Sequence, residues 1–299
     1  MAESNPAVNL FTVHSRSWRD NRYVYPVISR RSRGLSIGVN LNPDKVCNFD
    51  CIYCCVDRTV PPAVRDVDMS LLRRELEHML ELACSGQIWT IPPFDQTHPT
   101  LRRINDVAFS GDGEPTSFRQ FPQACELAAS LLEKFGRADI KIIVITNATL
   151  LHLPRVRRAL EFLDRHNGEI WAKLDAGTEQ YYRLVERTRI PFRRVLDNIL
   201  AAGRVRPIVI QSLFMNIHAQ PPDAAEIRAY VDRLVELRDA GCQIKLVQVY
   251  TVARRTAEAY VSPLEPSRLR DIAAQVAAIG LPVESYPGAE EESPATCQP

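Results

Sequence analysis

Six short apolar segments alternate with amphipathic segments along this chain, and this alternation constrains the fold more than any other feature. Residues 140–146 (I-K-I-I-V-I-T) are β-branched and almost continuously apolar, which is typical of strands buried on both faces of a parallel sheet. Strands that alternate with helices predict parallel β/α units wound in one direction. The predicted strands are residues 35–41, 106–109, 140–146, 169–175, 206–214 and 243–250.

Helical spacing of apolar residues follows most of these strands. Residues 69–83 and 121–135 are two such helices, and Pro154 opens a third. Residues 281–286 add a possible terminal strand. The chain is therefore of the α/β class, and its pattern fits an open sheet or a partial (β/α)6 barrel of parallel strands equally well.

Composition limits the partners and the cellular compartment that we expect for this protein. The chain has 299 residues, 45% of them apolar, with a formal net charge of +1. This balance does not favour a nucleic-acid partner, although local basic clusters exist. No stretch approaches the roughly 20 apolar residues that a membrane span needs. Eight cysteines without an apparent signal peptide indicate a reducing compartment, so we expect a cytoplasmic protein with no membrane partner.

Three cysteines at C-x3-C-x2-C spacing form the most informative motif. Cys47, Cys51 and Cys54 lie in the run C-N-F-D-C-I-Y-C-C and can present three thiolates to one metal cluster. A 4Fe–4S cluster held by protein alone normally takes four cysteines, so three leave one iron open to another ligand. The alternatives are a zinc knuckle, which usually brings a second Cys or His pair, and three ordinary buried cysteines. Cys55 breaks the spacing and is predicted not to be a ligand.

With Tyr53 before the last cysteine, this motif resembles the signature of the radical S-adenosylmethionine (SAM) superfamily. The resemblance implies that the three cysteines bind a 4Fe–4S cluster whose open iron is chelated by SAM. It favours the partial barrel and extends over residues 35–286. We therefore expect a basic lead-in packed on the core at residues 1–34, a radical SAM domain at 35–286 and a disordered tail at 287–299.

A glycine loop follows the second predicted strand. In β/α barrels the active site lies at the carboxyl ends of the strands, where the cysteine loop also falls. The segment S-G-D-G-E-P-T (110–116) matches a family segment that presents backbone carbonyls to the SAM amino group. The resemblance thus implies cofactor contacts at Gly111, Asp112, Gly113 and Glu114. An aspartate between the glycines leaves open which carbonyl makes the contact, and the loop is also readable as a plain strand-to-helix turn.

Polar residues at later strand ends extend this predicted site. Thr146 and Asn147 end the third strand and can bond the SAM ribose or cap the next helix. Lys173 and Asp175 share one face of the fourth strand, where a buried charged pair is costly without partners. The resemblance implies that they hold the SAM carboxylate and ribose, with a structural ion pair as the alternative. Weaker candidates are Gln211 on the fifth strand and, for the adenine, Tyr53 and the backbone of residues 249–251.

Two arginine groups are candidate substrate contacts. Arg30, Arg31 and Arg33 precede the first strand, and Arg254 and Arg255 follow the sixth. Guanidinium groups bind carboxylates and phosphates in a bidentate geometry, so together they predict an anion clamp at the barrel mouth. A solvated surface turn is the alternative for the first group.

The resemblance implies a radical enzyme that reductively cleaves SAM and abstracts a hydrogen atom from an unidentified small anionic metabolite, nucleotide or peptide. A flavodoxin or ferredoxin is the expected electron donor. The flanking segments Y-P-V-I-S-R-R-S-R-G-L-S-I-G-V-N and F-S-G-D-G-E-P-T look most like the branch that holds the wyosine-type tRNA-modifying enzymes and uncharacterised bacterial relatives. The alternatives are an activase of a glycyl-radical enzyme and a non-catalytic iron–sulfur sensor or electron carrier.

Overall fold

A curled, mainly parallel sheet forms the centre of the protein, of which this computed structural model describes residues 18–288. The strands of the large sheet are β1 (Val24–Ser29), β2 (Gly34–Val39), β3 (Ile104–Phe109), β4 (Lys141–Thr146), β5 (Gly168–Lys173), β6 (Ile208–Leu213), β8 (Ile244–Tyr250) and β10 (Val283–Tyr286). Their order is β1-β2-β3-β4-β5-β6-β8-β10. All neighbours run parallel except β1, which is antiparallel to β2.

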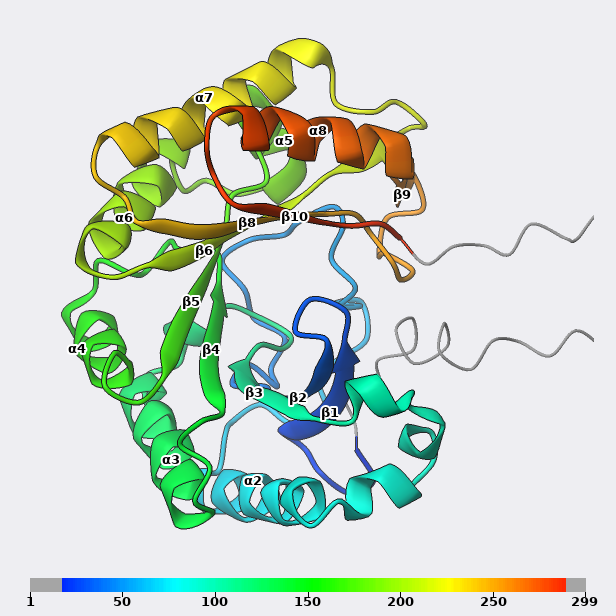
Figure 1. Cartoon of the computed structure of the whole chain (residues 1–299), viewed down its shortest axis with the longest axis vertical. Coiled ribbons are helices and arrows are strands. Elements are labelled where there is room, and N and C mark those ends of the chain that lie inside the picture. The colour runs from blue at the N-terminus through cyan, green and yellow to red at the C-terminus, as the bar shows by residue number, and fades with distance from the viewer. Residues whose placement is uncertain (1–17, 289–299) are drawn as a thin grey trace, which may run out of the picture.

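The curvature of this sheet distinguishes the two architectures that fit the sequence. The sheet bends into a half barrel, with helices covering its outer face (Figure 1). The six predicted strands correspond to β2, β3, β4, β5, β6 and β8, and the predicted terminal strand is β10. The partial (β/α)6 barrel is thus confirmed over the open sheet.

Amphipathic helices cover the outside of the half barrel. Each turns a strip of apolar side chains to the sheet, as Leu72, Leu76 and Met79 do in the first of them. No helix among residues 18–288 is long and apolar enough to cross a lipid bilayer. The helices are α2 (Met69–Cys84), α3 (Phe121–Lys134), α4 (Pro154–Leu163), α5 (Glu179–Glu186), α6 (Phe192–Val205), α7 (Ala224–Asp239) and α8 (Pro266–Ala278). A second, two-stranded sheet pairs β7 (Met215–Ile217) with β9 (Val261–Pro263).

Strand β1 lies within residues 1–34, for which the sequence predicts a basic lead-in packed on the core but no strand. Pro26 is compatible with this strand because an edge strand leaves one row of backbone groups unpaired. The Tyr25 ring packs on Gly38 of β2, where an added Cβ would lie only 2.3 Å from the ring. The predicted domain boundary at residue 34 therefore falls inside a β-hairpin, while residues 289–299 of the predicted tail lie outside the described residues.

The turn of this hairpin crosses the open side of the half barrel. A guanidinium nitrogen of Arg30 donates to the carbonyl oxygen of Pro287, just after β10. Inside the barrel, Ala108, Ile143, Trp171 and Val209 form a small apolar cluster. The hairpin and this cluster bound an interior space that opens toward the carboxyl ends of the strands.

Candidate functional site

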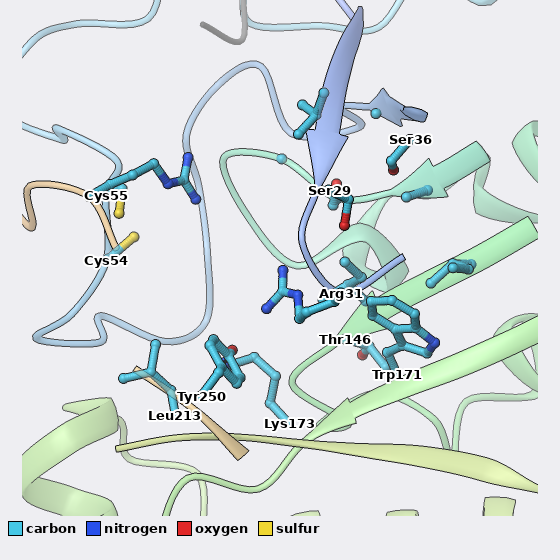
Figure 2. Close-up of a pocket in the computed structure, with 18 of the residues that line it drawn as sticks. Ser29, Arg31, Ser36, Cys54, Cys55, Thr146, Trp171, Lys173, Leu213 and Tyr250 are labelled. Atoms are coloured by element: carbon cyan, nitrogen blue, oxygen red, sulfur yellow. The ribbon is translucent and has the colours of Figure 1, made fainter. Parts of the chain in front are cut away.

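A cavity of about 320 Å³ occupies the interior of the half barrel. Its walls come from the loops after β2 and β3, the ends of β4, β5 and β8, and the β1–β2 hairpin. In Figure 2, Cys54 and Cys55 lie on one side of this space and Trp171 on the other. The sequence-predicted loops therefore meet at a single cavity, as the barrel rule requires.

All three motif cysteines line this cavity. Their loop is anchored to the end of α5, because the amides of Asp50 and Ile52 donate to the carbonyls of Glu186 and Val185 at 3.0 and 2.9 Å. Within the loop, the Cys54 amide donates to the Cys51 carbonyl at 2.9 Å and forms a tight turn. The loop is thus held by helix α5, whose last residue, Glu186, lies 135 residues after Cys51, and not by its own sequence alone.

Two of the three motif thiols have raised pKa values. Burial raises the pKa of the Cys47 thiol to about 11. It also raises the pKa of Cys51, whose sulfur lies 2.6 Å from Glu186 Oε2, and the neighbouring carboxylate raises it further. Such thiols stay protonated at neutral pH on their own, so metal binding would have to release protons from them.

Arg58 connects the cysteine loop to the glycine loop. Its guanidinium donates to Cys54 Sγ at 3.2 Å and to the carbonyl oxygen of Asp112 at 3.3 Å. Its Nε donates to the Lys45 carbonyl at 3.1 Å. Hydrogen bonds to ligand sulfurs tune the potential of iron–sulfur clusters. Sequence reasoning missed this residue, although an arginine four residues after the last motif cysteine was a usable signal.

The two glycines let the loop after β3 approach the cysteine loop closely. An added Cβ at Gly113 would lie 2.2 Å from the Val46 carbonyl oxygen, and one at Gly111 would lie 2.2 Å from Asn40 Oδ1. Both glycines line the cavity, so backbone is exposed to a ligand there. Asp112 does not line it: its carboxylate accepts a hydrogen bond from Asn40 Nδ2 at 2.7 Å.

Glu114 joins the ends of β3 and β4. Its buried carboxylate accepts hydrogen bonds from Thr146 Oγ1 at 2.6 Å, the Asn147 amide at 2.7 Å, and both the hydroxyl and amide of Thr116. Burial raises its pKa, and these donors partly offset that rise. Glu114, Thr146 and Asn147 do line the cavity, but these hydrogen bonds hold the rim together.

Lys173 and Asp175, the predicted contacts of the SAM carboxylate and ribose, form an ion pair with each other. Lys173 Nζ lies 3.2 Å from Asp175 Oδ2 and donates to the Tyr250 hydroxyl at 2.8 Å. Tyr53 donates its hydroxyl proton to Asp175 Oδ2 at 2.6 Å. Lys173 and Tyr53 line the cavity, whereas Asp175 does not. Gln211 also lies outside the lining and donates to Gln248 Oε1 at 2.7 Å.

The arginines divide into two groups. Arg30, Arg31 and Arg254 line the cavity, whereas Arg33 and Arg255 are exposed and do not. Burial, with Arg31 and Arg254 close by, lowers the pKa of Arg30 to about 10. The guanidinium carbon of Arg31 lies 4.7 Å from the Tyr250 ring centre and 5.9 Å from that of Trp171, and Figure 2 shows it pointing into the cavity.

The donor set fits a cluster with three protein ligands. Cys47, Cys51 and Cys54 supply one thiol each to the same cavity, beside a loop whose backbone is bared by glycine. Within residues 18–288, no group of three or more His, Cys, Asp or Glu side chains is gathered closely enough to hold a single metal ion. A cubane instead takes one cysteine at each of several irons.

Comparison with known proteins agrees with this arrangement. The family model described as Radical SAM superfamily matches residues 41–224, which is more than half of the chain. The chain therefore belongs to the radical SAM superfamily. A crystal structure of a radical SAM methyltransferase from Sphaerobacter thermophilus superimposes with a TM-score of 0.60, at 12% identity, over 88% of this chain and 68% of that one. At this identity the likeness concerns the fold alone.

Curated relatives include proteins named UPF0026. One from Helicobacter pylori strain J99 is 30% identical over 225 residues, covering 74% of this chain and 65% of the relative. One from Methanocaldococcus jannaschii is 29% identical over 180 residues, covering 58% and 46%. A protein named GTPase Obg, from Brachyspira hyodysenteriae, is 24% identical over 192 residues, covering 62% and 24%. The chain thus matches less than two thirds of the length of each of these relatives.

Proposed function

We propose that this protein is a radical SAM enzyme that abstracts a hydrogen atom from a small anionic substrate held inside the half barrel. The observation that carries the proposal is the meeting of three motif thiols and a glycine-bared backbone loop at one cavity. Cys47, Cys51 and Cys54 would hold a 4Fe–4S cluster, and SAM would lie along residues 111–114. When bound and reduced, this cofactor pair supplies a 5′-deoxyadenosyl radical and methionine.

The chain's own residues support that chemistry by position. Arg58 donates to a ligand sulfur and to the glycine loop, so it fixes the distance between the two loops. Glu114 holds the ends of β3 and β4, and Lys173 with Asp175 and Tyr53 stiffens the opposite wall. Walls held in this way would orient a bound substrate toward the radical, which limits side reactions.

The electron donor and the location belong to the same proposal. A flavodoxin or ferredoxin in the cytoplasm would reduce the cluster, which Cys47, Cys51 and Cys54 would hold at the open rim of the half barrel. Cys54 and Cys55 lie on the cysteine loop, and Cys55 is exposed.

Anaerobic reconstitution with iron and sulfide, followed by SAM and dithionite, tests the proposal. The wild-type protein should turn brown, bind about four irons and form 5′-deoxyadenosine. Cys51→Ala should lose the cluster and the product, whereas Cys55→Ala should keep both. A protein that assembles its cluster but forms no 5′-deoxyadenosine would instead be a sensor or electron carrier. Cluster loss in the Cys55 variant with retention in the Cys51 variant would refute the ligand assignment.

A further inference from the structure

The cavity extends beyond the proposed cofactor loops toward the amino ends of the strands. Ser36 on β2 and Asp106 on β3 lie opposite one another in register and both line this inner part. Ala108, Ile143 and Trp171 supply apolar walls beside them. The inner part of the cavity therefore combines a carboxylate, an apolar surface and the guanidinium of Arg31.

Asp106 is a buried carboxylate with an unused acceptor. Its residue is only 1% exposed, and one oxygen accepts a hydrogen bond from the Ser36 hydroxyl. The other oxygen, Oδ2, has no hydrogen-bond partner in the part of the chain that the structure describes. Burial raises the pKa of Asp106, although the Ser36 and Ser32 hydroxyls oppose the rise. A buried acceptor of this kind is unfavourable unless something donates to it.

Arg31 has no salt-bridge partner among residues 18–288. Its guanidinium stacks on the rings of Trp171 and Tyr250, and its positive charge opposes the rise in the pKa of Asp106. Stacking on aromatic rings limits the orientations of the guanidinium while its N–H edges stay available for a planar anion. Arg30 and Arg254, which line the same cavity, add positive charge nearby.

We propose that this inner part is a substrate subsite for a small molecule that carries an anionic group and a hydrogen-bond donor. The anion, a carboxylate or a phosphate, binds Arg31, and an ammonium or hydroxyl group donates to Asp106 Oδ2. The carbon skeleton between them lies against Ala108, Ile143 and Trp171. This assignment rests on the proposed function, because it names the class of molecule from which that enzyme would take hydrogen.

The test measures binding of four small probes to the cluster-loaded, SAM-bound protein by anaerobic calorimetry. L-Serine and glycerol 3-phosphate carry an anion and a donor, whereas propionate and methyl phosphate carry the anion alone. We expect one donor-bearing probe to bind at least about tenfold more tightly than the probe that carries the same anion alone. The probe without a donor would leave Asp106 Oδ2 without a hydrogen-bond partner. The preferred pair, the one whose donor-bearing member binds more tightly, identifies the anion that the subsite takes as a carboxylate or a phosphate.

Variants assign the contacts. Arg31→Gln should weaken both members of the preferred pair by about tenfold or more, and Asp106→Asn should abolish the preference for the donor. Arg31→Lys and Ser36→Ala serve as milder second variants if either fails to fold, and should give smaller losses in the same direction. Arg270→Gln, an exposed arginine on α8, is the control and should bind as wild type.

Two results would overturn the subsite. One is the absence of saturable binding for all four probes, including the case in which only a single-stranded RNA oligonucleotide binds and Arg31→Gln weakens it. The other is probe binding that Arg31→Gln and Asp106→Asn leave unchanged. Formation of 5′-deoxyadenosine by the same wild-type preparation separates the failures. If 5′-deoxyadenosine forms but no probe binds, only the subsite is refuted. If the cluster is loaded but no 5′-deoxyadenosine forms, the proposed function is refuted.

Discussion

Two pairs of charged residues, at or beside one cavity, differ in how their charges are satisfied. Lys173 and Asp175 form an ion pair at 3.2 Å and are bonded to two tyrosine hydroxyls. Arg31 and Asp106 lie in the same space, yet Arg31 has no ion pair and Asp106 has an unused oxygen within residues 18–288. Satisfied buried charges shape a site, whereas unsatisfied ones cost stability unless a ligand pairs with them.

Among the buried charges that are fully hydrogen-bonded, substitution of Glu114 should give the largest loss of stability. Glu114→Ala would leave buried donors of Thr116, Thr146 and Asn147 without an acceptor. We expect the free energy of unfolding to fall by about 4 kcal/mol, measured by urea denaturation of the apoprotein. Glu114→Gln keeps the shape and should cost less. A loss below about 1 kcal/mol for the alanine variant would show that these hydrogen bonds are not formed in solution.

Asp175→Asn should be next in size. The change preserves the side chain's shape but removes the counter-charge of Lys173, whose side chain is 16% exposed. An uncompensated buried cation should lower the free energy of unfolding by about 3 kcal/mol. Restoring neutrality with Lys173→Met in the same chain should recover part of that loss. No recovery in the double variant would mean that the two residues are not coupled.

Asp106→Asn should have a small effect with a distinctive pH dependence. At pH 7 the two proteins should differ in stability by about 1 kcal/mol or less, since the lost charge was poorly paired. Because burial raises the folded-state pKa of Asp106, the folded wild type binds this proton more tightly than the unfolded chain. Wild-type stability should therefore rise relative to the variant as pH falls from 7 through that raised pKa.

Denaturation of both proteins at several pH values between about 7 and 5 checks the sign of this effect. A relative loss of wild-type stability on acidification would show that the carboxylate is well paired in the folded state. That result would remove the contrast between the two sets of charges.

Arg31→Gln should change stability least. Within residues 18–288 Arg31 forms no salt bridge and stacks on two aromatic rings, so the free energy of unfolding should fall by about 0.5 kcal/mol. Differential scanning fluorimetry beside Asp175→Asn gives the comparison directly. A loss for Arg31→Gln as large as that for Asp175→Asn would assign Arg31 a structural role.

Local sequence patterns predicted much of the fold. Strand periodicity located β2 to β6 and β8, because burial on both faces selects apolar, β-branched runs. The same reasoning missed β1, where Pro26 and the polar turn that follows weaken the pattern. Asp106 was noted only as the start of an apolar strand, although an acidic residue on the inward face was a signal of a polar subsite.

By itself the sequence determined which residues recur at short range: three cysteines at C-x3-C-x2-C, two glycines in one loop, and strands that alternate with helices. Only the tertiary structure decided which distant groups meet them. Glu186 reaches Cys51, Glu114 joins Thr146 and Asn147, and Ser36 bonds Asp106. Spacing encodes geometry within a turn or loop, whereas the pairing of remote charges depends on how the sheet curls and which strands become neighbours.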